Sequence, residues 1–312
     1  MSSQIKFIDL FAGIGGMRLA FESTGATCVF SSEWDKYAQK TYEANFGEVP
    51  DGDITKIKAA EIPKFDILLA GFPCQPFSSI GKREGFEHKT QGTLFYDVAR
   101  IIDHHKPKAF LLENVAGLLT HDDGKTFTTI IYTLIELGYE VEYKILDASD
   151  YGVPQKRERI YIVGFNKNKV RSTDFIFPKP RKSKVGIGKF VESGRKDLSI
   201  SKHLQSVYIY KLPDGRPEVI TPKSDFPVKT LVASYHKIQR LTGTFVKDGP
   251  TGLRLLSESE CKSIMGFPKN FLIPVSRTQM YRQFGNSVAV PVVKQIGKSI
   301  VKHLEENSKR SS

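Results

Sequence analysis

The feature that most constrains the fold of this chain is a regular alternation of strand-like and helix-like segments in its first 165 residues. Short apolar runs predict strands at residues 5–11, 27–32, 66–70, 109–113, 140–147 and 159–165. Between them, amphipathic periodicity predicts helices at residues 35–45, 94–105 and 125–137. Such alternation is typical of a mostly parallel sheet with helices on both faces. We therefore predict a doubly wound α/β domain that binds its ligand beyond the carboxyl ends of the strands.

The amino-acid composition of the sequence changes after residue 165. Residues 166–275 are rich in Lys, Arg, Ser, Pro and Gly, with short strand-like pieces at 175–189 and 213–227 and a helical period at 257–265. A second helical period covers residues 288–304, with Pro291 in the first turn, where proline is tolerated. We predict a ligand-binding domain at 1–165, a smaller, irregular, β-containing domain at 166–275, and a C-terminal segment at 276–312 that packs back on the first domain.

The charge of the chain is unevenly distributed. The net charge is +12, and residues 1–165 carry 18 Lys and Arg against 23 Asp and Glu, whereas residues 166–312 carry 28 against 11. Because Lys and Arg that neutralise phosphates release counterions and so supply affinity, the basic second half favours a nucleic acid as partner.

The composition also argues against a membrane protein, an exported protein and a disulfide-bonded or zinc-binding protein. No stretch approaches the roughly 20 apolar residues of a membrane helix, and the N-terminus lacks the basic and apolar regions of a signal peptide. The three cysteines are an odd number at wide spacing, which fits neither a disulfide framework nor a zinc site. We expect a cytoplasmic protein without a metal.

Polar and glycine residues follow the predicted strands. Gly13, Gly15 and Gly16 form a turn between the first strand and a helix, where the backbone can approach a ligand closely. Glu33 ends the next strand about 20 residues later, where a carboxylate can hold the ribose hydroxyls of an adenosine cofactor. Trp34 can stack on a ligand or pack in the core, and Asp53 can reach an adenine amino group or form a turn.

A cysteine lies in the loop that follows the third predicted strand. Pro73 and Pro76 flank Cys74 and stiffen the chain around it, which suits a positioned nucleophile. Residues 80–92 then resemble a mobile lid with glycine hinges, in which Lys82 and Arg83 are candidate phosphate contacts.

Two further strands bring charged residues to the same region. Glu113 ends the fourth strand and is a candidate proton donor, provided that a dry pocket raises its pKa, or else a helix cap. Arg157 and Arg159 open the last strand, where one can bind a carbonyl oxygen and the other a phosphate or the protein frame.

The order of these motifs resembles that of the DNA (cytosine-5)-methyltransferases of bacterial restriction-modification systems. The matching segments are Phe-Ala-Gly-x-Gly-Gly at 11–16, Glu-Trp at 33–34, Gly-Phe-Pro-Cys-Gln-x-Phe-Ser at 71–78, Gly-Thr-Leu-Phe at 92–95, Glu-Asn-Val at 113–115, Gln-x-Arg-x-Arg at 155–159, Arg-Leu at 254–255 with Glu260, Gly-Phe-Pro at 266–268 and Gln-Phe-Gly-Asn-Ser-Val at 283–288. The match covers the chain except for a variable stretch after residue 165.

The resemblance implies a methyltransferase fold and S-adenosylmethionine as cofactor. It implies that Cys74 adds to C6 of a flipped-out cytosine, that Glu113 holds and protonates N3, and that Arg159 binds the O2 carbonyl, with Arg157 beside it. A side chain or a water would then remove the C5 proton. The implied cofactor residues are Phe11, Gly13, Ile14, Gly15, Glu33, Trp34, Asp53, Ile54, Pro73, Asn286 and Ser287.

The implied partner is double-stranded DNA, bound by a monomer, with a cognate restriction endonuclease as a separate protein outside any stable complex. The DNA-contacting candidates are Ser78, Lys82, Arg83, Thr230, Gln239 and Arg240. Three alternatives remain open: a tRNA methyltransferase of the same fold, a nicotinamide-dependent oxidoreductase, and a binding protein with a dead catalytic site.

Overall fold

The first 166 residues build one six-stranded sheet. A computed structural model describes residues 4–73, 94–172, 174–181 and 183–307. The strands are β1 (Lys6–Leu10), β2 (Thr27–Ser32), β3 (Ile67–Gly71), β4 (Ala109–Val115), β5 (Tyr139–Asp147) and β6 (Glu158–Asn166), in the order β2-β1-β3-β4-β6-β5. All neighbouring pairs are parallel except those that involve β6. The predicted mostly parallel α/β sheet is confirmed.

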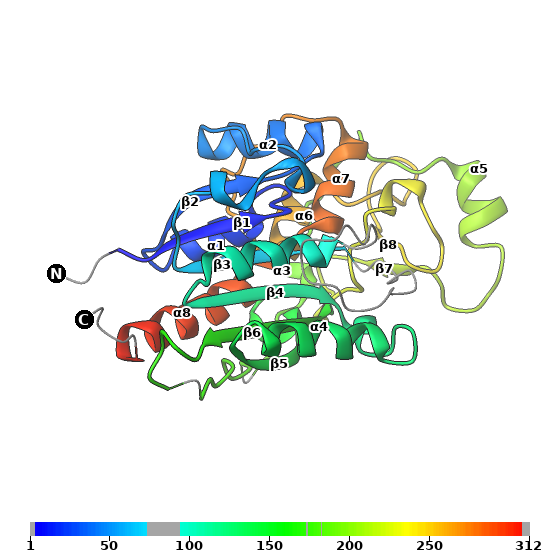
Figure 1. The fold of residues 1–312 in the computed structure, drawn as a ribbon. Coiled ribbons are helices and arrows are strands. Elements are labelled where there is room, and N and C mark those ends of the chain that lie inside the picture. The colour runs from blue at the N-terminus through cyan, green and yellow to red at the C-terminus, as the bar shows by residue number, and fades with distance from the viewer. Residues whose placement is uncertain (1–3, 74–93, 173, 182, 308–312) are drawn as a thin grey trace.

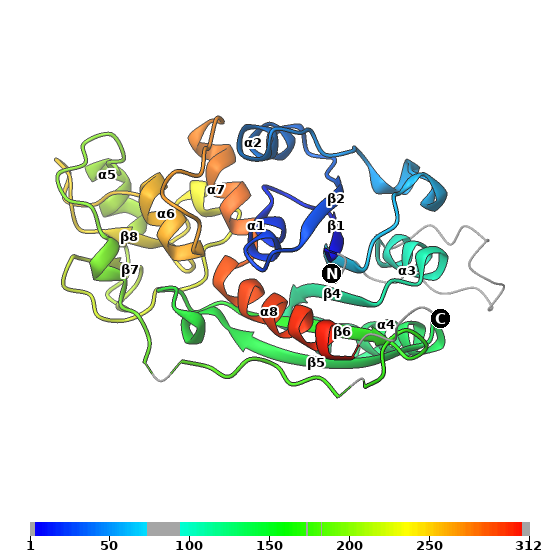
Figure 2. The same ribbon diagram turned by 90° about the vertical axis from the view of Figure 1, so that its left-hand side faces the viewer.

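Helices cover both faces of this sheet. The helices are α1 (Gly16–Glu22), α2 (Lys36–Phe46), α3 (Leu94–His105), α4 (Lys125–Glu136) and α8 (Val290–Asn307). Figures 1 and 2 show α1 and α8 on one face and α3 and α4 on the other. Successive strand residues serve opposite faces, since Leu69 packs in the core that includes α8, whereas Leu68 packs in the core that includes α3.

The direction of β6 decides which of its ends reaches the ligand edge. The chain runs from β2 to β3 across β1, so the crevice of the sheet lies beyond the carboxyl ends of β1 and β3. Because β6 is antiparallel to β4, the beginning of β6 lies at this same edge, and Arg159 is paired with Val115 at the end of β4. The residues that open β6 are therefore placed beside those that close β4.

The second half forms a smaller lobe with little regular structure. It contains α5 (Lys202–Leu204), the parallel pair β7 (Glu218–Ile220) and β8 (Thr244–Val246), α6 (Glu258–Met265) and α7 (Arg277–Asn286). The strand-like piece at 213–227 contains β7, but the described part of 175–189 forms no strand and ends in a 3₁₀ turn at Ile187–Phe190. That expectation was wrong, because Phe175 and Phe177 are buried against β6 and α8 without joining a strand ladder.

A buried ion network holds this lobe together. Arg254 is fully buried and donates to both carboxylate oxygens of Glu260, at 2.8 and 2.9 Å, and to Asp248 at 2.9 Å. Glu260 also accepts the N–H of Ser257 and so caps α6. Breaking such a buried pair costs on the order of 3–5 kcal/mol. The Arg254 and Glu260 motif therefore has a structural role.

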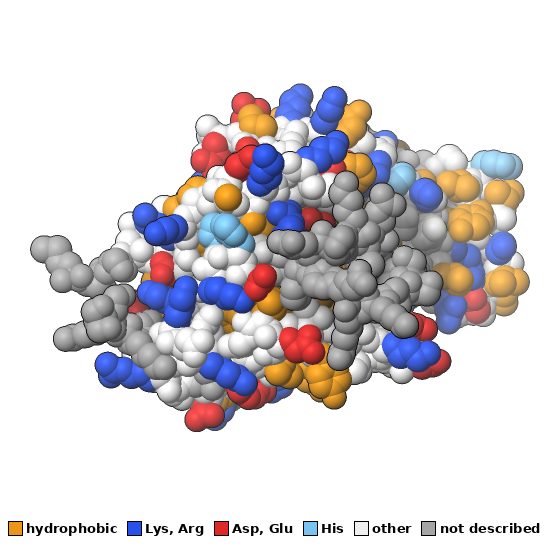
Figure 3. All heavy atoms as spheres, in the orientation of Figure 1, with side chains coloured by type: hydrophobic (Ala, Val, Ile, Leu, Met, Phe, Trp, Pro, Cys, Tyr) orange, Lys and Arg blue, Asp and Glu red, His pale blue; other side chains and the backbone are white. Residues whose placement is uncertain are grey.

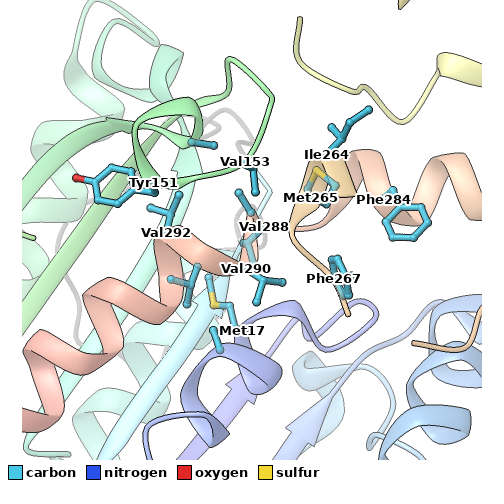
Figure 4. Packing of buried hydrophobic residues seen from close by; sticks show 14 of the residues in the cluster. Met17, Tyr151, Val153, Ile264, Met265, Phe267, Phe284, Val288, Val290 and Val292 are labelled. Carbon is cyan, nitrogen blue, oxygen red and sulfur yellow. The ribbon is translucent and has the colours of Figure 1, made fainter. Parts of the chain in front are cut away.

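The two lobes share one apolar core. Figure 4 shows side chains from α1, α6, α7 and α8 converging at the junction, among them Met17, Met265, Phe284 and Val290. The packing places α7 against the ligand edge of the sheet. Among the described residues, no helix is long and apolar enough to cross a membrane, and no group of three or more His, Cys, Asp or Glu side chains could hold a metal ion.

Candidate functional site

A pocket of about 430 Å³ lies at the carboxyl ends of the parallel strands. Its walls come mainly from the segments that follow β1, β2 and β3, from the end of β4, from the beginning of β6, and from α7 and the α7–α8 connection. The predicted residues that line it are Phe11, Gly13, Ile14, Glu33, Trp34, Pro73, Glu113, Arg157, Arg159, Asn286 and Ser287. Segments from both halves of the chain thus meet at one site.

Glu33 is fixed by the turn that follows β1. One of its carboxylate oxygens accepts the N–H of Gly13 at 2.8 Å, and the other accepts the N–H of Asp35 at 2.8 Å. Burial raises the pKa of Glu33, and these two hydrogen bonds oppose that rise. Each oxygen keeps a second lone pair, so the carboxylate can accept two hydroxyl groups from a ligand.

Gly15 does not line the pocket, yet the turn requires it. Its φ of 82° lies in the left-handed region, and a Cβ there would come within 2.2 Å of the Phe46 ring. Only glycine fits this position. Next to Glu33, Trp34 is 75% exposed at the pocket wall, so a face of its ring is open to a ligand.

Asp9 is a pocket residue that the sequence did not single out as functional. It is buried, burial raises its pKa to about 7, and it accepts the N–H of Arg18 at the start of α1 at 3.2 Å. The signal was present, because Asp9 interrupts an otherwise apolar strand.

Glu113 and Arg159 form an ion pair at the junction of β4 and β6. The Nε of Arg159 lies 3.2 Å from Oε1 of Glu113, and both side chains are mostly buried. Burial raises the pKa of Glu113, while the charges of Arg159 and Arg157 act in the opposite direction. The site therefore brings together a carboxyl that holds its proton to higher pH and a fixed guanidinium.

The chain that leads to Cys74 is anchored beside this pair. Asn114 donates through its side-chain amide to the carbonyl of Phe72 at 2.9 Å, and Pro73 lines the pocket. The predicted residues Cys74, Ser78, Lys82 and Arg83 lie outside the described residues.

The side chain of Arg157 is bound to backbone carbonyls of the protein itself. It is 3% exposed, and its guanidinium donates to the carbonyls of Leu231, Gly285 and Ser287, at 3.2, 3.1 and 2.7 Å. Burial lowers its pKa to about 10. Of the two arginines, it is Arg159 that forms the ion pair with Glu113. The geometry therefore favours a structural role for Arg157, which holds backbone segments in place.

Asp53 and Ile54 do not line the pocket. The Asp53 carboxylate accepts the N–H of Thr55 at 3.1 Å and caps a short 3₁₀ turn (Ile54–Lys56), while Ile54 packs in the core on the α3 face. Asp53 thus forms a turn, and its contact with an adenine amino group stays a prediction.

The predicted DNA-contacting residues of the smaller lobe differ in exposure. Thr230 donates to the carbonyl of Lys156 at 2.7 Å, and Gln239 is partly exposed. Arg240 is 4% exposed, and its guanidinium binds carbonyls and Asp214 within the lobe. This burial does not fit a base-reading side chain and corrects the expectation for Arg240.

The pocket is also lined by residues that the sequence analysis did not assign to the site, among them Leu94, Gln279, Arg282 and Gln283. Gln283 accepts from Thr41 at 2.9 Å and donates to the carbonyl of Tyr37 at 2.8 Å, so it joins α7 to α2. Leu94 and Gln283 belong to matched motifs, whereas Gln279 and Arg282 face the pocket only because α7 packs there.

The fold is that of a methyltransferase. The structure matches S. pombe Dnmt2 methyltransferase with a TM-score of 0.77 at 20% identity, covering 97% of this chain and 99% of that one. It also matches a Spodoptera frugiperda DNMT2 mutant with a TM-score of 0.77 at 23% identity, covering 97% and 100%. The described residues therefore have the same fold as these methyltransferases.

The chain belongs to the family described as C-5 cytosine-specific DNA methylase, whose model matches residues 5–302, and it is a DNA (cytosine-5)-methyltransferase. It is 59% identical over 299 residues to the type II methyltransferase M.MspI of Moraxella sp, covering 96% of this chain and 71% of that protein. It is 59% identical over 302 residues to the type II methyltransferase M.BsuFI of Bacillus subtilis, covering 96% and 73%. The family predicted from the motifs is confirmed, and the oxidoreductase alternative is excluded.

Proposed function

We propose that this chain transfers a methyl group from S-adenosylmethionine to C5 of a cytosine flipped out of a specific site in double-stranded DNA, as the modification enzyme of a type II restriction-modification system. The relatives named as type II methyltransferases support the biological role. It acts as a monomer, and the cognate endonuclease is a separate protein. Residues 166–253 choose the DNA site, because this basic stretch matches none of the motifs that lie on either side of it.

The pocket fits the cofactor. Its volume of about 430 Å³ lies within the roughly 300–1,000 Å³ of small-molecule sites. Glu33 offers two acceptor oxygens for a ribose, and the exposed face of Trp34 offers a stacking surface. When bound, S-adenosylmethionine supplies an electrophilic methyl group.

The observation that carries the mechanism is the Glu113–Arg159 pair at the wall of this pocket. The Cys74 thiolate adds to C6, which makes C5 electron-rich and able to take the methyl group. Glu113 gives a proton to N3, and Arg159 binds O2, so both favour the charge shift that accompanies the attack. Transfer of the methyl group leaves S-adenosylhomocysteine as the product of the cofactor. Loss of the C5 proton to water or a base then restores the C5–C6 double bond and expels Cys74 as a thiolate, while N3 returns its proton to Glu113.

Flipping the base costs a few kcal/mol, which contacts in the pocket and the groove offset. Arg157 helps to hold the wall of the pocket, since its guanidinium donates to the carbonyls of Gly285 and Ser287, which line the pocket, and to that of Leu231 in the smaller lobe.

Expression in a host whose DNA lacks 5-methylcytosine tests the function directly. We expect base-resolution sequencing to find 5-methylcytosine at one position of a short, fixed sequence throughout the genome, and none in total tRNA. Methylated tRNA with unmodified DNA would instead support the tRNA alternative and contradict the proposed substrate.

Trp34 gives an independent test of the cofactor, because it is the only tryptophan of the chain. S-adenosylmethionine should change its fluorescence in a saturable manner, whereas NAD should leave it unchanged. The change arises because a ligand held by Glu33 covers the exposed ring. A titration with both compounds checks this, and equal responses to the two would contradict the assignment of the pocket.

A further inference from the structure

Arg240 connects two segments of the smaller lobe that are far apart in the sequence. Its Nε donates to the carbonyl of Ile209 at 2.9 Å, and its Nη2 donates to the carbonyl of Leu212 at 3.2 Å and to the carboxylate of Asp214. Its backbone N–H contacts the Tyr208 hydroxyl at 3.4 Å. Arg240 thus binds the segment 208–214 at four positions, three through its buried side chain and one through its backbone.

The segment held by Arg240 is exposed and has little other support. Every residue from 210 to 216 is exposed, and no helix or strand lies between residue 210 and β7. Its side chains include those of Tyr210, Lys211 and Arg216, which suit contact with DNA bases and phosphates. Figures 1 and 2 show this chain, after α5, beside the chain that leads to β8.

The segment that carries Arg240 is fixed to the rim of the catalytic pocket. The backbone of Ala233 approaches Gly285 so closely that a Cβ at Gly285 would lie 2.2 Å from the Ala233 nitrogen. The Tyr235 ring packs on that of Tyr281 in α7, with centroids 4.8 Å apart. Residues 232–240 therefore run from the pocket wall to the segment 208–214.

We propose that Arg240 is a positioning residue for target recognition, whose guanidinium holds the segment 210–216 beside residues 234–239 so that both read the DNA site as one surface. This rests on the proposed function, in which residues 166–253 choose the site. Base reading requires side chains held within a fraction of an ångström by their supporting contacts. In a loop without a strand ladder, Arg240 supplies those contacts.

The guanidinium is the group that this arrangement needs. Its planar fork reaches several acceptors in fixed directions, whereas a lysine ammonium is a single point on a flexible stem. A lysine at position 240 would keep the positive charge near the exposed carboxylate of Asp214, but it would lose the simultaneous hydrogen bonds to the carbonyls of Ile209 and Leu212. The recognition surface should therefore respond to the shape of the side chain as well as to its charge.

The test compares Arg240→Met, Arg240→Lys and Asp214→Asn with a matched control, Arg195→Met. Arg195 belongs to the same lobe and forms ion pairs with Glu192 and Asp197, but it contacts neither segment. The substrates are duplex oligonucleotides that carry the mapped methylation site, and a set with one base pair changed in each. The readouts are kcat/KM on every duplex, the cofactor response of Trp34, and the Tm.

We expect Arg240→Met and Arg240→Lys to lower the ratio of kcat/KM between the mapped site and its variants by about tenfold or more at one or more base pairs, which is the loss expected for one base contact. Asp214→Asn should lower it less, and Arg195→Met not at all. The cofactor response should stay unchanged in all four. If Arg240→Met fails to fold, the Lys and Asn variants carry the test.

Unchanged discrimination in folded Arg240→Lys and Arg240→Met proteins would overturn the proposal. Substitution of Gln239 and of Arg216 by alanine separates this result from a failure of the proposed function. If these two alter discrimination while the Arg240 variants do not, the positioning role alone is wrong. If none of the variants alters it, the assignment of site choice to this lobe is wrong as well.

Discussion

Replacement of Cys74 by serine is expected to abolish methyl transfer while leaving folding and cofactor binding intact. A thiol provides a thiolate nucleophile near neutral pH, whereas a serine hydroxyl without an adjacent base stays protonated and adds poorly to C6. Transfer of labelled methyl groups to duplex DNA measures the loss, and the Trp34 response to S-adenosylmethionine measures cofactor binding.

The matched control for this variant is Cys28→Ser. Cys28 lies in β2, outside the pocket, and burial raises the pKa of its thiol to about 12, so it holds its proton. DNA that contains 5-fluorocytosine should trap the wild-type enzyme covalently, because its C5 substituent cannot leave as a proton. Near-normal turnover by the Cys74→Ser enzyme would show that no covalent step through Cys74 takes place.

Glu113→Gln is expected to slow the chemical step by about 100-fold to 10,000-fold, the usual loss when a positioned general acid is removed. Glutamine keeps the shape of the side chain beside Arg159, so DNA binding should persist. Single-turnover methylation with enzyme in excess measures this rate directly. A rate equal to that of the wild type would remove Glu113 from the mechanism.

The pH dependence of the same step gives a second measurement of Glu113. Burial raises its pKa, so the proton that the step requires is present below that pKa and is lost as the pH rises through it. The wild-type rate should therefore fall on the alkaline side of its maximum. The Glu113→Gln enzyme cannot titrate there, and its rate should lack that fall.

Much of the larger lobe could be predicted from its sequence because local patterns decide it. The central strands β3 and β4 are buried on both faces, so they appear as apolar runs at residues 67–70 and 109–112. The direction of β6 could not be predicted, since parallel and antiparallel buried strands share this pattern. The antiparallel pairing of β6 with both β4 and β5 determines this direction.

The candidate site was predictable where a polar residue ends a strand, as Glu33 and Glu113 do. It was not predictable where packing between segments far apart in the sequence determines which residues line the pocket. Arg282 lines the pocket because α7 packs on the junction of the lobes, and the sequence of α7 has no strong apolar stripe. Arg240 was misassigned for the same reason, because its partners lie 26 to 31 residues earlier in the chain.

The meeting of distant segments at the pocket also sets the order in which the enzyme becomes competent. Gly16 is so close to Ser287 that an added Cβ would lie 2.8 Å from its hydroxyl oxygen. A ribosome makes the six strands well before it makes α7 and the start of α8, and N-terminal parts can fold first. One wall of the pocket is missing until then. The nascent protein therefore completes this pocket late in translation, after the lobe proposed to choose the DNA site has already been made.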